Sequence, residues 1–204
     1  MSRIYYQDEW VTLWHGDWRE VVAQADVLIT DPPYGLGAIM QGGEVKWPLW
    51  EGRSQAGLPW DAATSGFVPD LVARFPNAVV WGGQYYALPP RRGWLVWDKI
   101  VRNFSSGHVE LAWTTLDQPT RAFSYAHGQL ASEGKHHPTQ KPLPLMEWCI
   151  GMTSGSVLDP FAGSGTTLVA AKNLGRKSIG VELEEKYCEI AAKRLSQGVL
   201  ELGA

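Results

Sequence analysis

The segment Val157–Thr167, with the sequence VLDPFAGSGTT, restricts the folds open to this chain more than any other stretch. A short apolar run leads into a glycine-rich turn, and a helix-like pattern follows over Thr166–Leu174 and ends at Gly175. Glycine allows the backbone to turn sharply and allows a ligand to approach it closely. A strand that turns directly into a helix is typical of α/β folds, so we expect a sheet covered by helices.

The rest of the chain repeats this alternation of strands and helices. Further helix-like patterns span Pro142–Met152 and Glu184–Leu195. The apolar runs that predict strands are Val11–Trp14, Val27–Thr30, Ala78–Trp81, Trp94–Trp97, Val109–Trp113, Ser156–Leu158 and Ser178–Val181. Several runs are continuously apolar, which favours strands buried on both faces of a mostly parallel sheet. We therefore predict an α/β, doubly wound sheet.

Length and composition set the domain organisation. The 204 residues are enough for one α/β domain and too few for two, so we predict a single domain over residues 1–204. The N-terminal nine residues lack the pattern of a signal peptide, and no apolar run reaches the ~20 residues that span a bilayer. We expect a soluble, cytoplasmic protein without membrane contact, in which Cys149 and Cys188 are buried thiols. The histidines and cysteines have no metal-ligand spacing, so no metal is predicted.

The glycine turn and the strand after it predict a site for a nucleoside cofactor. Glu182 ends that strand about 20 residues beyond the turn, where a carboxylate can accept hydrogen bonds from a ribose diol. A dinucleotide fingerprint needs a small residue where Leu168 stands, and a phosphate-binding loop needs a Gly-Lys-Ser/Thr triplet that the sequence lacks. Phe161 beside the turn suits a cofactor with an adenosine and an amino acid rather than a pyrophosphate. A tight turn that binds nothing is the alternative.

A second motif, Asp31-Pro32-Pro33-Tyr34, follows the predicted strand Val27–Thr30, at the end of a strand where open α/β sheets bind ligands. Consecutive prolines cannot continue a strand, and they fix a rigid, extended exit from the sheet. An exocyclic amine of adenine or cytosine is a poor nucleophile, because its lone pair is delocalised into the ring. Asp31 and a proline carbonyl can accept hydrogen bonds from its two N–H groups, and Tyr34 can stack on a base that has left the duplex. All four residues are predicted to be catalytic.

Together, the two motifs resemble the amino-group DNA methyltransferases, which transfer a methyl group from S-adenosyl-L-methionine to N6 of adenine or N4 of cytosine. The motif order, with Asp31–Tyr34 before Phe161–Gly165, resembles the circularly permuted beta group of that family. The resemblance extends from about residue 12 to 195. It implies a Rossmann-like sheet of seven strands with one reversed, and a role in DNA methylation and restriction-modification.

The resemblance also assigns the cofactor site. Leu13–Asp17 looks like the segment whose Asp contacts the cofactor's adenine, and His137–Pro142 looks like the element whose polar side chains help hold the methionine end. The predicted cofactor-binding residues are Asp17, Asp31, Thr139, Lys141, Asp159, Phe161, Ala162, Gly163, Ser164, Gly165, Thr166 and Glu182.

The implied reaction is direct attack of a flipped base's amine on the sulfonium methyl group, without a covalent enzyme intermediate. Neither cysteine follows a proline, which argues against methylation at the ring carbon of cytosine. In the family, Asp at the position of Asp31 favours N6 of adenine, and N4 of cytosine is the alternative. A methyltransferase acting on RNA or on a protein amide is a further alternative, although Asp31 in place of Asn argues against the amide. A non-catalytic binding module would be expected to lack Asp31, Tyr34 or Gly163, and none is missing.

The predicted partner is DNA, although the net charge of −3 is unusual for a protein that binds a polyanion. Residues 91–141 carry seven basic and four acidic groups, and this part is the predicted nucleic-acid face. Its basic residues are Arg91, Arg92, Lys99, Arg102, Arg121, Lys135 and Lys141. The sequence indicates neither a recognition sequence nor a partner nuclease, while beta-group relatives often pair, which implies a homodimer.

Two stretches are predicted to serve target recognition. A short region at about 99–136 is the first. The second is an inserted loop, 35–76, which is irregular apart from a short predicted helix at Val68–Arg74. We expect its Trp47, Trp50 and Trp60 to close over the flipped base or to insert into the duplex.

Overall fold

The predicted alternation is present in a computed structural model, which describes residues 1–34, 66–100, 107–126 and 140–197. The strands are β1 (Arg3–Gln7), β2 (Val11–His15), β3 (Val27–Thr30), β4 (Asn77–Trp81), β5 (Trp94–Asp98), β6 (Val109–Thr114), β7 (Arg121–Ser124), β8 (Val157–Asp159) and β9 (Ser178–Glu182). The α-helices are α2 (Val68–Val72), α4 (Leu143–Gly151), α5 (Thr166–Asn173) and α6 (Glu185–Ser196). Two 3-10 turns, η1 (Trp18–Glu20) and η2 (Gly83–Tyr85), complete the described elements.

The strands form one sheet in the order β1-β2-β9-β8-β3-β4-β6-β5-β7. The five strands from β2 to β4 are parallel, whereas β1 and β6 run in the opposite direction. The described sheet thus has nine strands with two reversed, instead of the predicted seven with one reversed. The two strands missed, β1 and β7, are the outer edges of the sheet, and their largely exposed sequences RIYYQ and RAFS lack the continuous apolar run of a buried strand.

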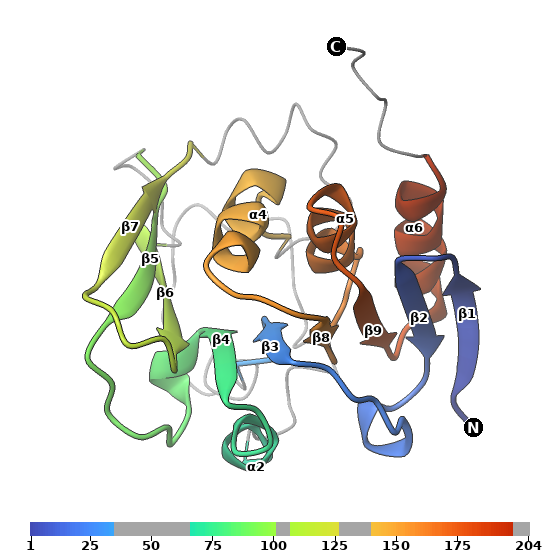
Figure 1. The fold of residues 1–204 in the computed structure, drawn as a ribbon, viewed down its shortest axis with the longest axis horizontal. Helices are drawn as coiled ribbons and strands as arrows, with labels where there is room; N and C mark the ends of the chain where they lie inside the picture. Colours follow the sequence, from blue (N-terminus) through green and yellow to red (C-terminus); the bar gives the residue numbers. More distant parts are fainter. Residues whose placement is uncertain (35–65, 101–106, 127–139, 198–204) are drawn as a thin grey trace, which may run out of the picture.

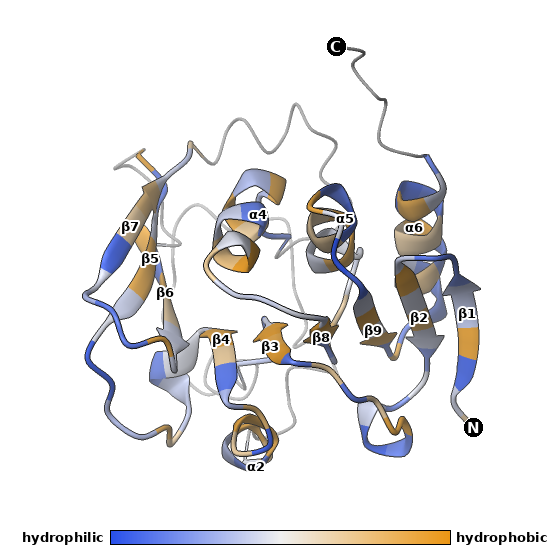
Figure 2. Ribbon diagram, in the orientation of Figure 1, coloured by the Kyte–Doolittle hydropathy of each residue, from blue (hydrophilic) through white to orange (hydrophobic). Residues whose placement is uncertain are grey.

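Helices cover both faces of the sheet, as predicted. Figure 1 shows α4, α5 and α6 along one face and α2 on the other. Successive residues of β3 enter different layers: Val27 and Ile29 pack with α4, while Leu28 packs with α2. Figure 2 shows the corresponding hydropathy, with apolar residues concentrated on the central strands.

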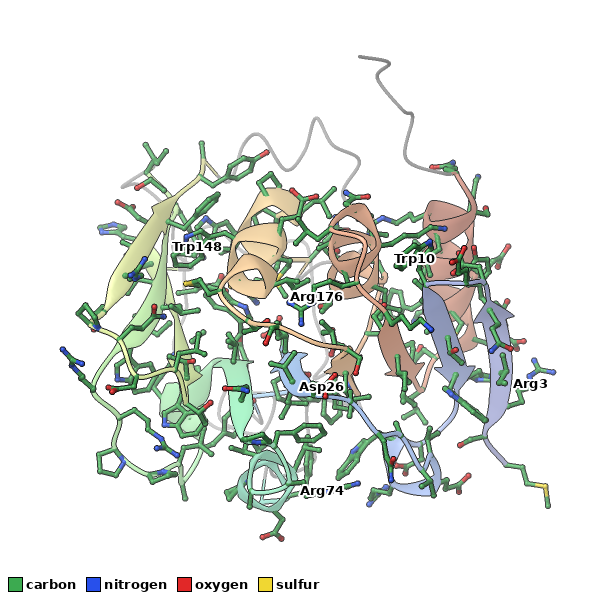
Figure 3. All side chains as sticks on the ribbon, viewed as in Figure 1. Arg3, Trp10, Asp26, Arg74, Trp148 and Arg176 are labelled. Atoms are coloured by element: carbon green, nitrogen blue, oxygen red, sulfur yellow. The ribbon has the colours of Figure 1, made fainter. Side chains whose placement is uncertain are left out.

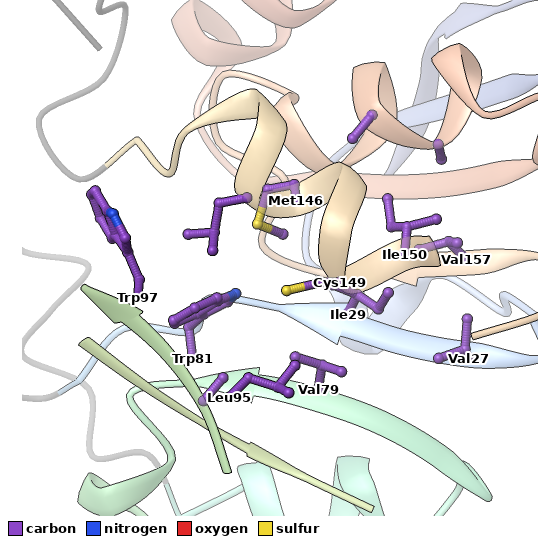
Figure 4. Packing of buried hydrophobic residues seen from close by; sticks show 14 residues of the cluster. Val27, Ile29, Val79, Trp81, Leu95, Trp97, Met146, Cys149, Ile150 and Val157 are labelled. Carbon is purple, nitrogen blue, oxygen red and sulfur yellow. The ribbon is translucent and has the colours of Figure 1, made fainter. Parts of the chain in front are cut away.

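The core between the sheet and α4 is rich in large side chains. Figure 4 shows Met146 and Cys149 of α4 lying over Trp81 and Ile29. The prediction that Trp81, Trp97 and Trp113 are core residues is confirmed, since each is at most 2% exposed. Cys149 and Cys188 are also buried, as predicted, and burial raises the pKa of the Cys188 thiol to about 12.

The direction of the strands places the predicted site along the line of strand carboxyl ends. From here on, the edge of the sheet means this line of strand ends, and not the outermost strands β1 and β7. The carboxyl ends of β2, β9, β8, β3, β4 and β5 share this edge, and the reversed strand β6 begins there. The opposite edge is closed by a different set of polar contacts. There, Asp26 accepts hydrogen bonds from the backbone N and Oγ of Ser156, and Arg176 donates to Gly155 O at 2.6 Å; Figure 3 labels Asp26 and Arg176.

Parts of the two predicted recognition stretches belong to the core of the fold. The short helix expected within loop 35–76 is α2, and its residues Val68, Leu71 and Val72 are buried. In the region at about 99–136, strands β6 and β7 are members of the sheet. Trp47, Trp50 and Trp60 lie outside the described residues. No helix in the described ranges is long and apolar enough to cross a membrane.

Candidate active site

The two sequence motifs meet at the junction of β3 and β8. These strands pair in parallel, so the residues that follow them emerge side by side. A buried hydrogen bond of 2.8 Å from Thr30 Oγ1 to Asp159 Oδ1 joins the two strand ends directly. Asp31 is the residue after Thr30, and the glycine turn begins after Asp159. The segment Asp31–Tyr34, called the Asp-Pro-Pro-Tyr corner below, and the glycine turn are therefore neighbours at the same edge of the sheet.

Asp159 fixes the start of the glycine turn. Its Oδ1 also accepts from Phe161 N at 3.1 Å, and its Oδ2 accepts from Thr167 Oγ1 at 2.5 Å. Burial raises the pKa of Asp159 to about 6, even though these hydrogen bonds favour the ionised form. No Lys or Arg among the described residues forms an ion pair with it.

The two central glycines of the turn face different surroundings. A Cβ on Gly163 would meet no atom of the described residues within 4 Å, whereas a Cβ on Gly165 would lie 2.8 Å from Cβ of Ala191 in α6. Both have positive φ, +53° and +79°, which favours glycine. Gly163 thus leaves open space beside the turn, while Gly165 allows the turn to pack against α6.

Glu182 closes the other side of the turn. Its Oε2 accepts from Gly163 N and its Oε1 from Glu184 N, both at 2.8 Å. Burial raises the pKa of this carboxyl as well, against the effect of those hydrogen bonds. In the part of the chain that the structure describes, Glu182, like Asp159, has no ion-pair partner.

The remaining turn residues mostly face the protein. Arg194 of α6 donates to Ser164 O at 2.6 Å and to Thr166 Oγ1 at 3.0 Å, and Ser164 Oγ donates to Gln140 Oε1 at 3.2 Å. Ala162 is buried, and its N–H donates to Val181 O. These contacts hold the shape of the turn.

Aromatic rings line the sheet face beside the turn. Phe161 stacks on Phe67 with ring centroids 5.5 Å apart, and Trp18 contacts the Phe161 ring edge-on at 6.2 Å. Asp17 precedes Trp18 and accepts from Arg19 Nε at 2.9 Å, and this contact lowers the pKa of Asp17. Asp17 follows β2, and the last residue of β2, His15, is paired with Glu182. Asp17 therefore emerges from the sheet on the side of Glu182.

The Asp-Pro-Pro-Tyr corner is held at both its carboxylate and its carbonyl groups. Tyr34 OH donates to Asp31 Oδ1 at 2.6 Å, and Tyr86 OH lies 3.0 Å from Pro32 O and 3.2 Å from Pro33 O. The Tyr34 ring also stacks on Tyr85 at 5.0 Å. It lies so close to the backbone that a Cβ on Gly82 would come within 2.1 Å of it.

A chain of alternating charges extends from Asp31 away from the glycine turn. Lys141 Nζ lies 2.5 Å from Asp31 Oδ2 and 3.1 Å from Glu110 Oε2, and Lys99 Nζ lies 2.8 Å from Glu110 Oε1. Burial by itself would raise the pKa of Glu110, but the two lysines outweigh it and lower the pKa to about 2. Burial would likewise lower the pKa of Lys141, but the carboxylates of Asp31 and Glu110 hold it well above its usual value.

The structure thus places the described members of the predicted site at one edge, and adds three residues that the sequence analysis missed. These are Tyr86, Glu110 and Lys99, and Lys99 is the buried ion-pair partner of Glu110. A charged Glu110 within the otherwise apolar run Val109–Trp113 was the available signal. Thr139 lies outside the described residues.

The predicted nucleic-acid face is not a single surface. Lys99 and Lys141 are buried in the charge chain, with side chains 3% and 6% exposed. Arg91 and Arg92 precede β5 and Arg121 begins β7, so all three lie at the edge of the sheet opposite Asp31. For Lys99 and Lys141 the prediction is wrong, because net charge along the chain does not reveal which lysines are buried in ion pairs. Arg102 and Lys135 lie outside the described residues.

Known structures share this fold. The chain aligns with the M1.HpyAVI–SAM complex at a TM-score of 0.54 and 23% identity, over 91% of this chain and 98% of that one. It aligns with the PvuII DNA methyltransferase, described as cytosine-N4-specific, at a TM-score of 0.60 and 17% identity, over 98% of this chain and 91% of that one.

Sequence comparisons identify relatives over part of the chain. The chain is 52% identical over 65 residues to type II methyltransferase M2.LlaDCHI of Lactococcus lactis subsp. cremoris, covering 30% of this chain and 24% of that protein. It is 46% identical over 79 residues to the putative methylase YubD of Escherichia coli (strain K12), covering 36% of this chain and 34% of that protein. The matches thus span about a quarter to a third of these relatives. The model of the N6/N4 DNA methylase family matches residues 73–193, more than half of the chain. The chain belongs to this DNA methylase family.

Proposed function

We propose that this chain is an S-adenosyl-L-methionine-dependent methyltransferase that methylates an exocyclic amino group of a base in DNA. The observation that carries the proposal is the Thr30–Asp159 hydrogen bond, which joins the Asp31 corner to the glycine turn. An acceptor for an amine and a turn suited to a nucleoside are thereby adjacent. Adjacency of this kind is what direct group transfer requires, because positioning can supply much of the rate enhancement.

The residues at the turn fit this cofactor. Glu182 stands at a strand tip, where its carboxylate can accept from the ribose hydroxyls, and Gly163 leaves space beside the backbone. Asp159 and Glu182 are carboxyl groups with raised pKa values and no cationic partner in the described ranges, so a positively charged ligand would stabilise their ionised forms. Asp17 would contact the adenine, and Thr139 the methionine end. When bound, S-adenosyl-L-methionine supplies a methyl group activated by its sulfonium.

Asp31 and Pro32 would hold the target amine. A carboxylate offers about four lone-pair sites, and Lys141 and Tyr34 occupy one on each Asp31 oxygen, so the carboxylate keeps capacity for an amine N–H. The Pro32 carbonyl likewise has a second lone pair beside its contact with Tyr86. Two acceptors would favour a pyramidal nitrogen whose lone pair points at the methyl group. The ring of Tyr34, whose hydroxyl is hydrogen-bonded to Asp31, would stack on the flipped base.

N6 of adenine is the proposed target, because Asp at the first motif position resembles the adenine-specific members of the family. N4 of cytosine is the second candidate, since the fold is shared with a protein described as cytosine-N4-specific. The motif order is proposed to be that of the circularly permuted beta group, because β3 with its Asp31 precedes β8 in the chain while lying beside it in the sheet. We further propose that the chain takes part in restriction-modification, that it pairs into a homodimer and that it is located in the cytoplasm.

Mass spectrometry of nucleosides tests the activity and the target together. DNA and RNA are incubated with the chain and methyl-labelled cofactor, digested and analysed. If the proposal is right, the digest of DNA contains labelled N6-methyl-2′-deoxyadenosine. Labelled N4-methylcytosine would select the second candidate, and label only in RNA, or in neither nucleic acid, would contradict the proposal.

A further inference from the structure

Lys141 was expected to hold the methionine end of the cofactor, yet its ammonium group is already engaged. An ammonium has three N–H donors. Asp31 Oδ2 at 2.5 Å, Glu110 Oε2 at 3.1 Å and Tyr34 OH at 3.4 Å account for all three. With a side chain only 6% exposed, Lys141 has no donor left for a cofactor carboxylate.

The partners of Lys141 come from separate parts of the fold. Asp31 follows β3, Glu110 belongs to β6, and Lys141 itself precedes α4. Glu110 is held in turn by Lys99, which follows β5. Such a network fixes each side chain through the next, and a buried charge that keeps its partner has a strongly preferred position.

We propose that Lys141 is a positioning residue for Asp31, held in place by Glu110 and Lys99, so that the Asp31 carboxylate stays directed at the incoming amine. This inference rests on the proposed methyl transfer, because it assigns Asp31 to the amine. Within the described residues, Lys141 and Lys99 balance the carboxylates of Asp31 and Glu110. Lys141 then acts on the amine only through Asp31.

Removal of the Lys141 ammonium would leave Asp31 among acidic neighbours. Among the described residues, the ionisable groups near Asp31 are Tyr34 in its own segment, Asp159 from β8, Glu110 from β6 and Lys141 from the segment before α4. The other lysine of the described charge chain, Lys99, is paired with Glu110. Like charges favour uptake of a proton, and a protonated carboxyl is a poorer acceptor.

The first test measures methylation kinetics from pH 5 to 9 for the parent chain, Lys141→Met, Lys141→Arg and the double variant Lys141→Met/Glu110→Gln. Lys141→Met is expected to lower kcat about 100-fold at pH 7 while KM for DNA and cofactor affinity change little. The acidic limb of its kcat profile should move to higher pH. The double variant should move that limb partly back, because one like charge is gone, and Lys141→Arg should recover part of kcat.

Lys172→Met is the matched control. Lys172 Nζ forms an ion pair with Asp8 Oδ2 at 2.6 Å, far along the sheet from Asp31 on the β2 side. This variant removes a lysine–aspartate pair but should leave the kcat profile unmoved. The proposal is overturned if Lys141→Met keeps the parent profile, or if it loses cofactor affinity in proportion to activity, as a residue that holds the cofactor would.

A second test needs neither DNA nor cofactor. In ¹⁵N-lysine-labelled protein, the Lys141 ammonium resonance is identified by its loss in Lys141→Met. It should shift in Asp31→Asn and in Glu110→Gln, and stay in place in Lys172→Met. An unchanged resonance in Asp31→Asn would refute the pair. A parent chain that methylates no nucleic acid, with the resonance behaving as expected, would instead refute the proposed function and with it the role of Asp31.

Discussion

The two halves of the site treat their carboxylates in opposite ways. On the β6 side, Glu110 lies between Lys141 and Lys99, and its pKa falls to about 2. On the β9 side, the partners of Asp159 and Glu182 in the described part of the chain are hydroxyl and N–H groups, and burial raises the pKa values of both carboxyl groups. In the first half, lysines of the chain pair with the carboxylates. In the second half, a cationic ligand would stabilise the ionised form of the carboxyl groups.

This difference matches the division of labour that we propose. The half that holds the amine needs an acceptor in a fixed position whether or not cofactor is present, and the ion pairs with Lys141 and Lys99 hold it there. The half that binds the cofactor keeps carboxyl groups whose ionised form is stabilised when a sulfonium and an ammonium arrive. Charge is therefore preorganised at the amine and supplied by the ligand at the turn.

The largest expected effect comes from the amine half. Asp31→Ala should lower kcat by roughly 10³-fold, since a positioned acceptor contributes on the order of 10²–10⁴. Cofactor affinity, measured by calorimetry, should fall much less. Asp117→Ala, at an exposed carboxylate paired with Arg92, is the control and should match the parent. Turnover near the parent rate in Asp31→Ala would remove the distinction between the halves.

Within the turn, the two glycines should separate binding from stability. Gly163→Val places a side chain in the open space, so cofactor affinity should fall at least about tenfold, beyond the roughly 1–2 kcal/mol of backbone strain at positive φ. Gly165→Ala clashes with Ala191, so its main effect should be a loss of roughly 1–3 kcal/mol in the free energy of unfolding. Calorimetry and chemical denaturation distinguish them. Equal effects on affinity would show that both glycines face the ligand.

Because the carboxyl group of Asp159 has a raised pKa, cofactor binding is expected to depend on pH. A cationic ligand favours the ionised form of Asp159, whose pKa in the protein is about 6, so affinity should rise as pH increases from 5 to 7, by up to about tenfold. Asp159→Asn should flatten this rise, while Glu110→Gln should leave it in place because Glu110 is ionised throughout. Calorimetric titration at several pH values is the measurement. A parent affinity that is independent of pH would show that the cofactor's charge does not reach Asp159.

The smallest effect is expected at the carbonyl groups of the corner. Tyr86→Phe removes the hydroxyl that contacts Pro32 and Pro33, at a cost of about 1 kcal/mol, so kcat should fall a few-fold. Tyr85→Phe is the control, because it keeps the ring that stacks on Tyr34. A loss in Tyr86→Phe no larger than in Tyr85→Phe would mean that the prolines hold the corner unaided.

The sequence predicted the parts of this molecule whose signal is local. The buried strands and the glycine turn follow from apolar runs and from glycine, and the residues of both motifs emerge where strand ends predict them. The edge strands β1 and β7 were missed, because strands paired on one side need no apolar run.

The charge chain was beyond a reading of the sequence for a different reason. Lys141 and Glu110 are 31 positions apart, and only the antiparallel insertion of β6 beside β4 brings Glu110 to the edge of Asp31. The same fact misled the charge analysis, which counted Lys99 and Lys141 as groups available to DNA. Pairing across strands is a tertiary property, and composition by segment does not contain it.

A crystal structure of the chain with S-adenosyl-L-methionine would show whether the methyl donor and Asp31 meet as proposed. We expect the ribose at Glu182, the turn at Gly163 in contact with the ligand, and the sulfonium methyl directed at the Asp31 carboxylate, with Lys141 still bound to Asp31. A cofactor whose methyl group points away from Asp31, or whose carboxylate has drawn Lys141 off Asp31, would contradict this expectation.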